Sequence, residues 1–178
     1  MRQPICHVVN VRAMPRAGRS EAFEADEQAR LALRDHLGIR DVRSFSASAD
    51  ITAWRGDGVK VEGRVSADLV QDCIVTLEPI ETQVDETFEA VFVPEGSRLD
   101  NPAMGDVQMM VDAEGDDPPE TFPGDALDLG PVWTEFLTLA VDPFPRKPGA
   151  ELPSAEGETE PSPFAALAKL KAANGNQP

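Results

Sequence analysis

Hydrophobic and polar residues alternate along two consecutive stretches near the middle of the chain. The first runs from Ser44 to Ala53 and the second from Val59 to Leu69, and Gly56-Asp57-Gly58 separates them as a turn. Because successive strand residues point to opposite faces, this pattern predicts an antiparallel hairpin with one apolar and one polar face. A third alternating run, from Val84 to Phe92, predicts another strand of the same sheet.

Two other segments have the spacing of amphipathic helices. From Ser20, a predicted N-cap, apolar residues recur at helical spacing as far as Leu37, and Gly38 is placed to end that helix. The apolar residues from Leu129 to Ala140 also recur at this spacing, with Asp128 as a predicted cap. A sheet with one apolar face needs a cover. We therefore expect an α+β fold, an antiparallel sheet of short strands covered by these two main helices.

The character of the sequence changes after Pro94. Residues 95–125 are acidic and contain Gly-Ser, Asn-Pro and Pro-Pro pairs, so we expect an irregular loop with one short strand near Val107 to Val111. The stretch from Glu151 onward is acidic and contains Pro, Ser and Gly, which is typical of disorder. The sequence therefore predicts one domain over residues 1–149 and a disordered tail over 150–178, with a short helix candidate at 163–172.

The net charge of −16 is concentrated in the second part of the chain. Residues 1–74 contain 11 basic and 11 acidic residues, whereas residues 75–178 contain 5 basic and 21 acidic ones. An acidic field repels phosphate backbones and attracts basic proteins. This distribution disfavours broad binding to naked RNA and permits a basic protein partner, although solubility alone also explains it.

No motif of catalysis or of cofactor binding is recognisable in the sequence. There is no phosphate-binding glycine loop, and two cysteines with two histidines, His7 and His36, do not form a standard zinc set. We expect Cys73 to be a small packed cysteine, with the neighbouring Asp72 raising its thiol pKa. The start of the chain has no apolar signal region. We therefore expect a cytoplasmic protein without enzymatic activity, cofactor or metal.

The stretch from Asp72 to Pro94 is similar to a known family signature. Cys73 ends a strand, a Leu77-Glu78-Pro79 turn follows, and the next strand contains Phe88 before Pro94. This order resembles the centre of the DUF177/YceD family, and the flanking segments resemble its alphaproteobacterial branch. The resemblance implies a non-enzymatic ribosome-biogenesis factor needed for accumulation of large-subunit (23S) ribosomal RNA. Many relatives contain C-x-x-C here, but this chain has Thr76, so no metal or redox role is implied for it.

The basic residues after the second predicted helix form a candidate partner-binding segment. Its proposed binding residues are Pro143, Pro145, Arg146, Lys147, Pro148 and Gly149. This proline-rich stretch is either a rigid recognition element or a helix-terminating loop whose cations pair with nearby carboxylates. The partners we expect are a basic ribosomal protein, precursor ribosomal RNA reached mainly through protein, or another assembly factor. We expect neither a membrane nor a small-molecule substrate.

Two alternative functions stay open from the sequence alone. A metal-dependent RNA-processing nuclease would need a folded carboxylate cluster, for which the candidates are Asp112, Glu114, Asp116 and Asp117. A general protein-binding adaptor would share every physical feature with a ribosome-biogenesis factor. Only the family resemblance separates these last two.

Overall fold

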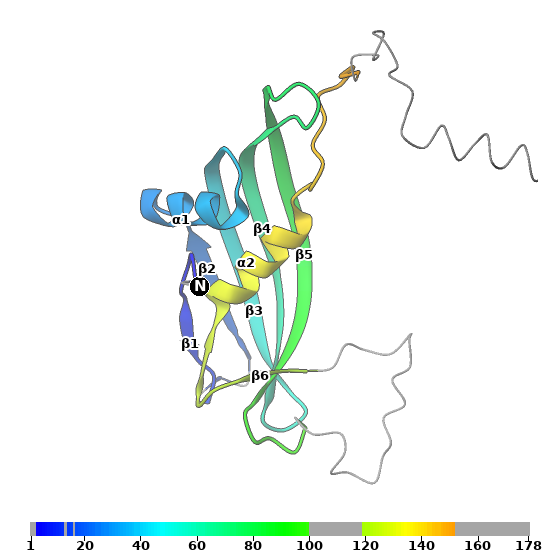
Figure 1. Cartoon of the computed structure of the whole chain (residues 1–178). Coiled ribbons are helices and arrows are strands. Elements are labelled where there is room, and N and C mark those ends of the chain that lie inside the picture. The colour runs from blue at the N-terminus through cyan, green and yellow to red at the C-terminus, as the bar shows by residue number, and fades with distance from the viewer. Residues whose placement is uncertain (1–2, 13, 16, 100–118, 152–178) are drawn as a thin grey trace, which may run out of the picture. The chain divides into compact units, whose positions relative to one another are not determined.

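The computed structural model describes residues 3–12, 14–15, 17–99 and 119–151, which form two sheets and two helices (Figure 1). The main sheet has the order β2 (Arg19–Glu24), β3 (Asp41–Trp54), β4 (Gly58–Asp72), β5 (Pro79–Pro94) and β6 (Glu120–Phe122). A small sheet pairs β1 (Val8–Asn10) with β7 (Ala126–Asp128), and the helices are α1 (Glu27–Leu37) and α2 (Leu129–Ala140). The predicted α+β class is confirmed.

The predicted hairpin and third strand are confirmed as β3, β4 and β5. These strands pair antiparallel, and their alternation places the apolar residues, including Phe45, Val65 and Phe88, on one buried face. The polar residues between them lie on the opposite, exposed face. The strands contain 14, 15 and 16 residues, so they are longer than the short strands that we expected.

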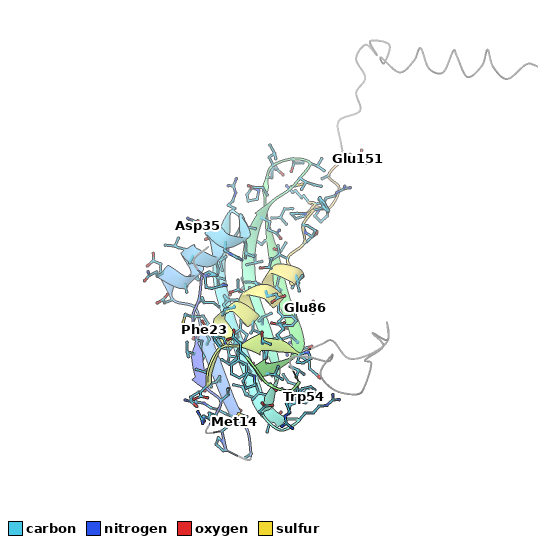
Figure 2. The ribbon with its side chains drawn as sticks, turned by 60° about the horizontal axis from the view of Figure 1, so that its bottom comes forward. Met14, Phe23, Asp35, Trp54, Glu86 and Glu151 are labelled. Atoms are coloured by element: carbon cyan, nitrogen blue, oxygen red, sulfur yellow. The ribbon has the colours of Figure 1, made fainter. Side chains whose placement is uncertain are left out.

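Helix α2 packs on the apolar face of the main sheet, as its sequence pattern predicted. Asp128 caps it, because its carboxylate accepts a hydrogen bond from the Gly130 N–H at 3.0 Å. Trp133 is fully buried and stacks on Phe23 of β2, with 5.7 Å between the ring centroids. Side chains drawn as sticks occupy the space between this helix and the sheet (Figure 2). The core of the fold therefore lies between α2 and the sheet.

The predicted helix beginning at Ser20 is wrong over its first part. Residues 19–24 form the edge strand β2, which pairs antiparallel with β3, and α1 begins only at Glu27. Asp26 is the N-cap instead, and its carboxylate accepts from the Ala29 N–H at 2.8 Å. Pairing with β3 buries one side of Phe23 and satisfies backbone groups that a helix start would leave free. Gly38 does end the helix, as predicted.

Part of the predicted irregular loop forms regular structure. Residues 120–122 form β6, which pairs parallel with the last residues of β5, and Glu95 N–H donates to the Phe122 carbonyl at 2.9 Å. The predictions of a strand near 107–111 and a helix at 163–172 concern residues outside the described ones. The chain divides into two compact units, residues 1–148 and 149–178, and only residues 149–151 of the second are described.

Candidate partner-binding site

The two segments that the sequence singled out contact each other. Strands β4 and β5 are joined by residues 73–78, and the Ile74 N–H in this connection donates to the Pro145 carbonyl at 3.0 Å. The connection and the segment after α2 therefore lie side by side (Figure 1). We call residues 72–79 together with residues 142–148 the tip.

A buried glutamine ties the tip to the sheet. Gln71 is buried near the end of β4, and its Nε2 donates to the Asp142 carbonyl at 2.8 Å. Its Oε1 accepts from the Thr82 hydroxyl of β5 at 3.0 Å. A buried polar group with its partners in place fixes the segments it joins, because leaving it unpaired is costly. The sequence analysis missed Gln71, although a polar residue after Leu69-Val70 was a usable signal.

The thiol of Cys73 lies at the centre of the tip. It is fully buried, as predicted, and its Sγ accepts from the backbone N–H of Lys147 at 3.4 Å and of Thr76 at 3.5 Å. The Cys73 N–H donates to the Glu78 carbonyl at 2.8 Å, which closes the turn. One small side chain therefore contacts both halves of the tip.

The predicted rise in the Cys73 pKa is wrong. The backbone N–H of Lys147, followed by the hydrogen bond from Thr76, stabilises the thiolate and lowers the pKa of Cys73 to about 7, while burial partly opposes this. The carboxylate of the neighbouring Asp72 forms an ion pair with Arg40 at 2.7 Å. The donor with the largest effect comes from the far segment, so no local sequence pattern could reveal it.

This lowered pKa predicts a pH-dependent contribution of Cys73 to stability. A thiol whose pKa falls from 9.0 when unfolded to about 7 when folded releases its proton earlier in the native state. The unfolding free energy of the wild type relative to Cys73→Ser should therefore rise between pH 7 and pH 9, and this contribution is lost below that range. Urea unfolding of both proteins across this range measures the difference.

Cys6→Ser is the matched control for this prediction. Cys6 is exposed, and a hydrogen bond to the Asp128 carboxylate raises the pKa of its thiol, so this variant should show no such rise over the same range. A wild-type minus Cys73→Ser difference that stays flat from pH 7 to pH 9 would contradict the role assigned to the two N–H donors.

Large apolar side chains point outward from this hydrogen-bonded frame. Leu77 is 73% exposed, Phe144 is 67% exposed and Ile74 is 43% exposed. Leu77 also has a positive φ of 58°, in the left-handed region that non-glycine residues adopt at a cost. Residues held in such a conformation concentrate at functional sites. The tip therefore presents apolar surface on a backbone that several long-range hydrogen bonds hold in place.

The two cations of the tip have different surroundings. Lys147 Nζ donates to Glu78 Oε2 at 2.7 Å, so this lysine pairs with a local carboxylate. Arg146 is exposed and forms no ion pair within the described part of the chain. Beside the tip lies a hollow of about 410 Å³, lined by residues from the end of α1, the end of β4 and the Pro143–Pro145 stretch. The tip thus has exposed apolar side chains and one cation, Arg146, without an ion pair in the described part of the chain, and a hollow lies beside it.

Not every predicted site residue belongs to this surface. Phe88 lies in the core, where it stacks on Phe136 at 4.5 Å, and Pro94 ends β5 at the opposite end of the sheet. Of the candidate binding residues, Pro143, Arg146, Lys147 and Pro148 are exposed and Pro145 is buried. Gly149 falls in the second unit of the chain. Binding by any of these residues stays a prediction.

The nuclease alternative needs a metal site. Within the residues described, no group of three or more His, Cys, Asp or Glu side chains could hold a metal ion. The four carboxylates on which the nuclease alternative depends lie outside those residues. Similarly, none of the helices that the structure describes is long and apolar enough to cross a membrane.

A comparison with known protein families identifies the family of this chain. Residues 61–171 match the family model described as "Large ribosomal RNA subunit accumulation protein YceD". The chain belongs to the YceD family. The match includes β4 from Val61 onward, β5, α2 and the whole tip, so it confirms the predicted family resemblance. No curated protein and no solved structure matches the chain. The YceD name implies a role in accumulation of large-subunit ribosomal RNA and suggests an accessory protein of ribosome assembly.

Proposed function

We propose that this YceD protein is a non-enzymatic ribosome-biogenesis factor that uses its tip to bind a protein partner during large-subunit assembly in the cytoplasm. The partner is a basic ribosomal protein or an assembly factor, and precursor RNA is reached through that protein. The observation that supports this proposal most is the exposure of Leu77 and Phe144 on a hydrogen-bonded frame. Exposed apolar groups at fixed positions are typical of protein-binding sites.

The charge of the chain favours a protein partner over naked RNA. The net charge is −16, and the tip contains only one cation, Arg146, that is not already paired within the described residues. Proteins that bind RNA through its backbone neutralise several phosphates with Lys and Arg. A single free arginine beside apolar side chains instead suits a protein surface, where Arg and aromatic residues are enriched.

Depletion of the protein followed by capture of its partners tests the proposed function. Depletion should lower mature large-subunit RNA relative to small-subunit RNA and raise its precursors. Tagged wild-type protein should enrich ribosomal proteins or assembly factors from lysate at low salt, with RNA lost after nuclease treatment and proteins retained. Unchanged RNA levels on depletion, or capture that disappears entirely with the RNA, would contradict the proposal.

A further inference from the structure

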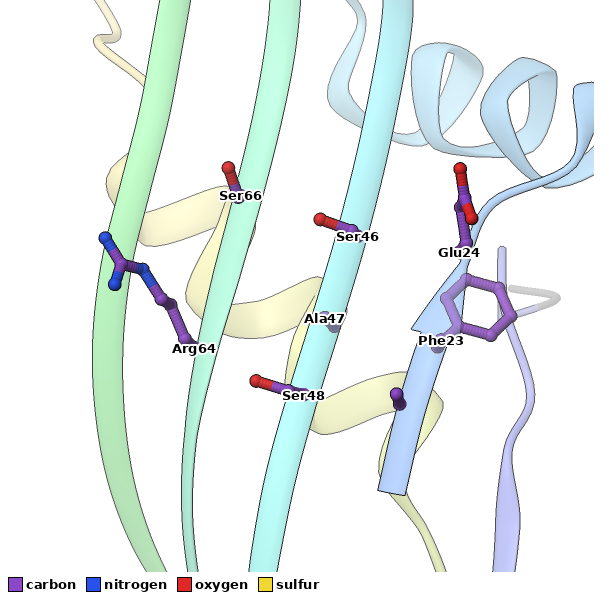
Figure 3. Close-up of a pocket in the computed structure, with 8 residues that line it drawn as sticks. Phe23, Glu24, Ser46, Ala47, Ser48, Arg64 and Ser66 are labelled. Atoms are coloured by element: carbon purple, nitrogen blue, oxygen red, sulfur yellow. The ribbon is translucent and has the colours of Figure 1, made fainter. Parts of the chain in front are cut away.

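The second face of the main sheet is open over four strands. Helix α2 packs on the apolar face, and the polar face contains outward residues of β2, β3, β4 and β5. Figure 3 shows part of this polar face, with α2 behind the sheet and the side chains of Ser46, Ser48, Ser66 and Arg64 in front. We call this surface the serine face. None of the described helices covers it.

The centre of the serine face consists of unusually small side chains. Ala22, Ser48 and Arg64 are aligned across β2, β3 and β4, and Ser46 and Ser66 are aligned in the next row. Strands favour β-branched and aromatic residues, whose large side chains shield the backbone. Ala22, Ser46, Ser48 and Ser66 are smaller than these residues and shield it less. Small side chains in the middle of a sheet leave the backbone open to close approach by another molecule.

These small residues form the floor of a shallow hollow. It has a volume of about 430 Å³ and is lined by residues that include Glu24, Ser46, Ser48, Arg64 and Ser66. Glu24 and Arg64 are the charged side chains that line it (Figure 3). Serine hydroxyls accept and donate hydrogen bonds, so the floor of the hollow can bind polar groups of a ligand.

The serine face is also strongly acidic. Arg43 beside Asp68 pairs with Glu81 at 2.8 Å, so these two residues add no net charge. The five aligned rows from Lys60 to Asp68 contain six carboxylates against two cations, Lys60 and Arg64, which leaves four net negative charges; the carboxylates belong to Glu24, Asp50, Glu62, Asp68, Asp85 and Glu89. Both cations are already paired, because Arg64 binds Asp85 and Lys60 binds Glu62 and Glu89 at 3.2 and 2.9 Å. Such a surface repels phosphate backbones and also repels a second copy of itself.

We propose that the serine face binds a lysine- and arginine-rich segment of another protein. This inference rests on the proposed function and specifies the chemistry of its partner. Glu24 and Asp50 form no ion pair within the described residues, although Asp50 accepts a hydrogen bond from the Ser20 hydroxyl. Their carboxylates pair with the cations of that segment, and the small residues between them admit its backbone to the hollow. The tip and the serine face are separate surfaces, so a protein with a basic extension can contact both.

Binding of a labelled peptide of alternating Lys and Thr to the full chain tests this proposal. The variant Glu24→Gln/Asp50→Asn/Glu62→Gln removes three charges from the face, and the control Asp35→Asn/Glu86→Gln/Glu95→Gln removes three exposed charges elsewhere. Because exposed ion pairs are individually weak, removing three should raise the dissociation constant about tenfold. The control should raise it less than about threefold.

Additional measurements separate a site from general attraction. Ser48→Arg, which fills the hollow and adds a positive charge, should weaken peptide binding without lowering the unfolding free energy. Peptide binding should also protect the amides of β3 and β4 from hydrogen exchange. Equal losses in both triple variants, no protection of these strands, or tighter binding of a single-stranded RNA of equal length would overturn the proposal.

The result for this face can be separated from the result for the proposed function. If depletion lowers large-subunit RNA and the Ser48→Arg protein restores it fully, the proposed function stands and the serine face is not its binding site. If depletion leaves large-subunit RNA unchanged, the proposed function itself fails, whatever the peptide shows.

Discussion

Replacing Trp133 with alanine is expected to lower the free energy of unfolding by about 3–5 kcal/mol, the range for removing a large buried aromatic side chain. Trp133 is fully buried in α2 and stacks on Phe23 of β2. Its ring centroid also lies 5.1 Å from that of His7, whose backbone carbonyl accepts from the Leu129 N–H. The indole therefore joins the N-terminal segment, the edge strand and the helix, and its loss leaves a cavity between all three.

Urea unfolding followed by circular dichroism measures this loss. Leu139→Ala is the control, because Leu139 lies on the same helix but is 74% exposed, and it should change stability by less than about 0.5 kcal/mol. A Trp133→Ala protein that loses no more stability than the control would show that α2 does not pack on the sheet as described.

Replacing Gly63 with valine is expected to destabilise the protein by about 3 kcal/mol, at the upper end of the range for overpacking. A Cβ atom at Gly63 would lie 2.4 Å from the Ser48 carbonyl oxygen and 2.5 Å from a ring carbon of Phe88. Valine is a good strand former, so strand propensity alone predicts that this substitution would stabilise the protein. The loss would therefore report the close approach of both the Ser48 carbonyl and the Phe88 ring to Gly63.

A double-mutant cycle with Phe88→Ala identifies the cause of that loss. Removing the ring relieves the contact with Phe88 and leaves the one with the Ser48 carbonyl, so the double variant should lose less stability than the sum of the two single variants. Thr87→Val, on the exposed face of β5 next to Phe88, is the control and should leave the free energy of unfolding nearly unchanged. Simple additivity in the cycle would mean that Phe88 does not occupy the space over Gly63.

The parts of the fold that follow from short-range pattern were predictable. The alternation in β3, β4 and β5 and the helical spacing of α2 each identify an element and its buried face, because both periods are set by local backbone geometry. Edge strand β2 was not predictable in the same way. Ser20 followed by Glu21 and Glu24 has the features of a helix start, and only pairing with β3, far along the chain, decides for a strand.

The tip was predictable in its parts but not as a unit. The sequence identified the Cys73 turn and the Pro143–Gly149 segment separately, yet their contact depends on hydrogen bonds between residues far apart in the chain, such as Lys147 N–H to Cys73 Sγ. The same contact reverses the predicted direction of the thiol pKa. A local sequence pattern can indicate candidate residues for such a site. The pKa values of those residues depend on which distant backbone groups the fold brings close to them.

We propose, from the YceD match and the geometry of the tip, that the exposed apolar residues of the tip act in large-subunit RNA accumulation. Leu77→Ser/Phe144→Ser tests it most directly in cells depleted of the native protein. Both side chains are largely exposed, so the variant should fold with a stability within about 1 kcal/mol of the wild type. The control Val8→Ser/Leu31→Ser changes two exposed apolar residues outside the tip.

The measurement is the ratio of mature large-subunit to small-subunit RNA after complementation with each protein at equal abundance. We expect the control variant to restore the wild-type ratio and the tip variant to leave it at the depleted level. Full restoration by a folded Leu77→Ser/Phe144→Ser protein would contradict the assignment of the tip as the working surface of this YceD protein.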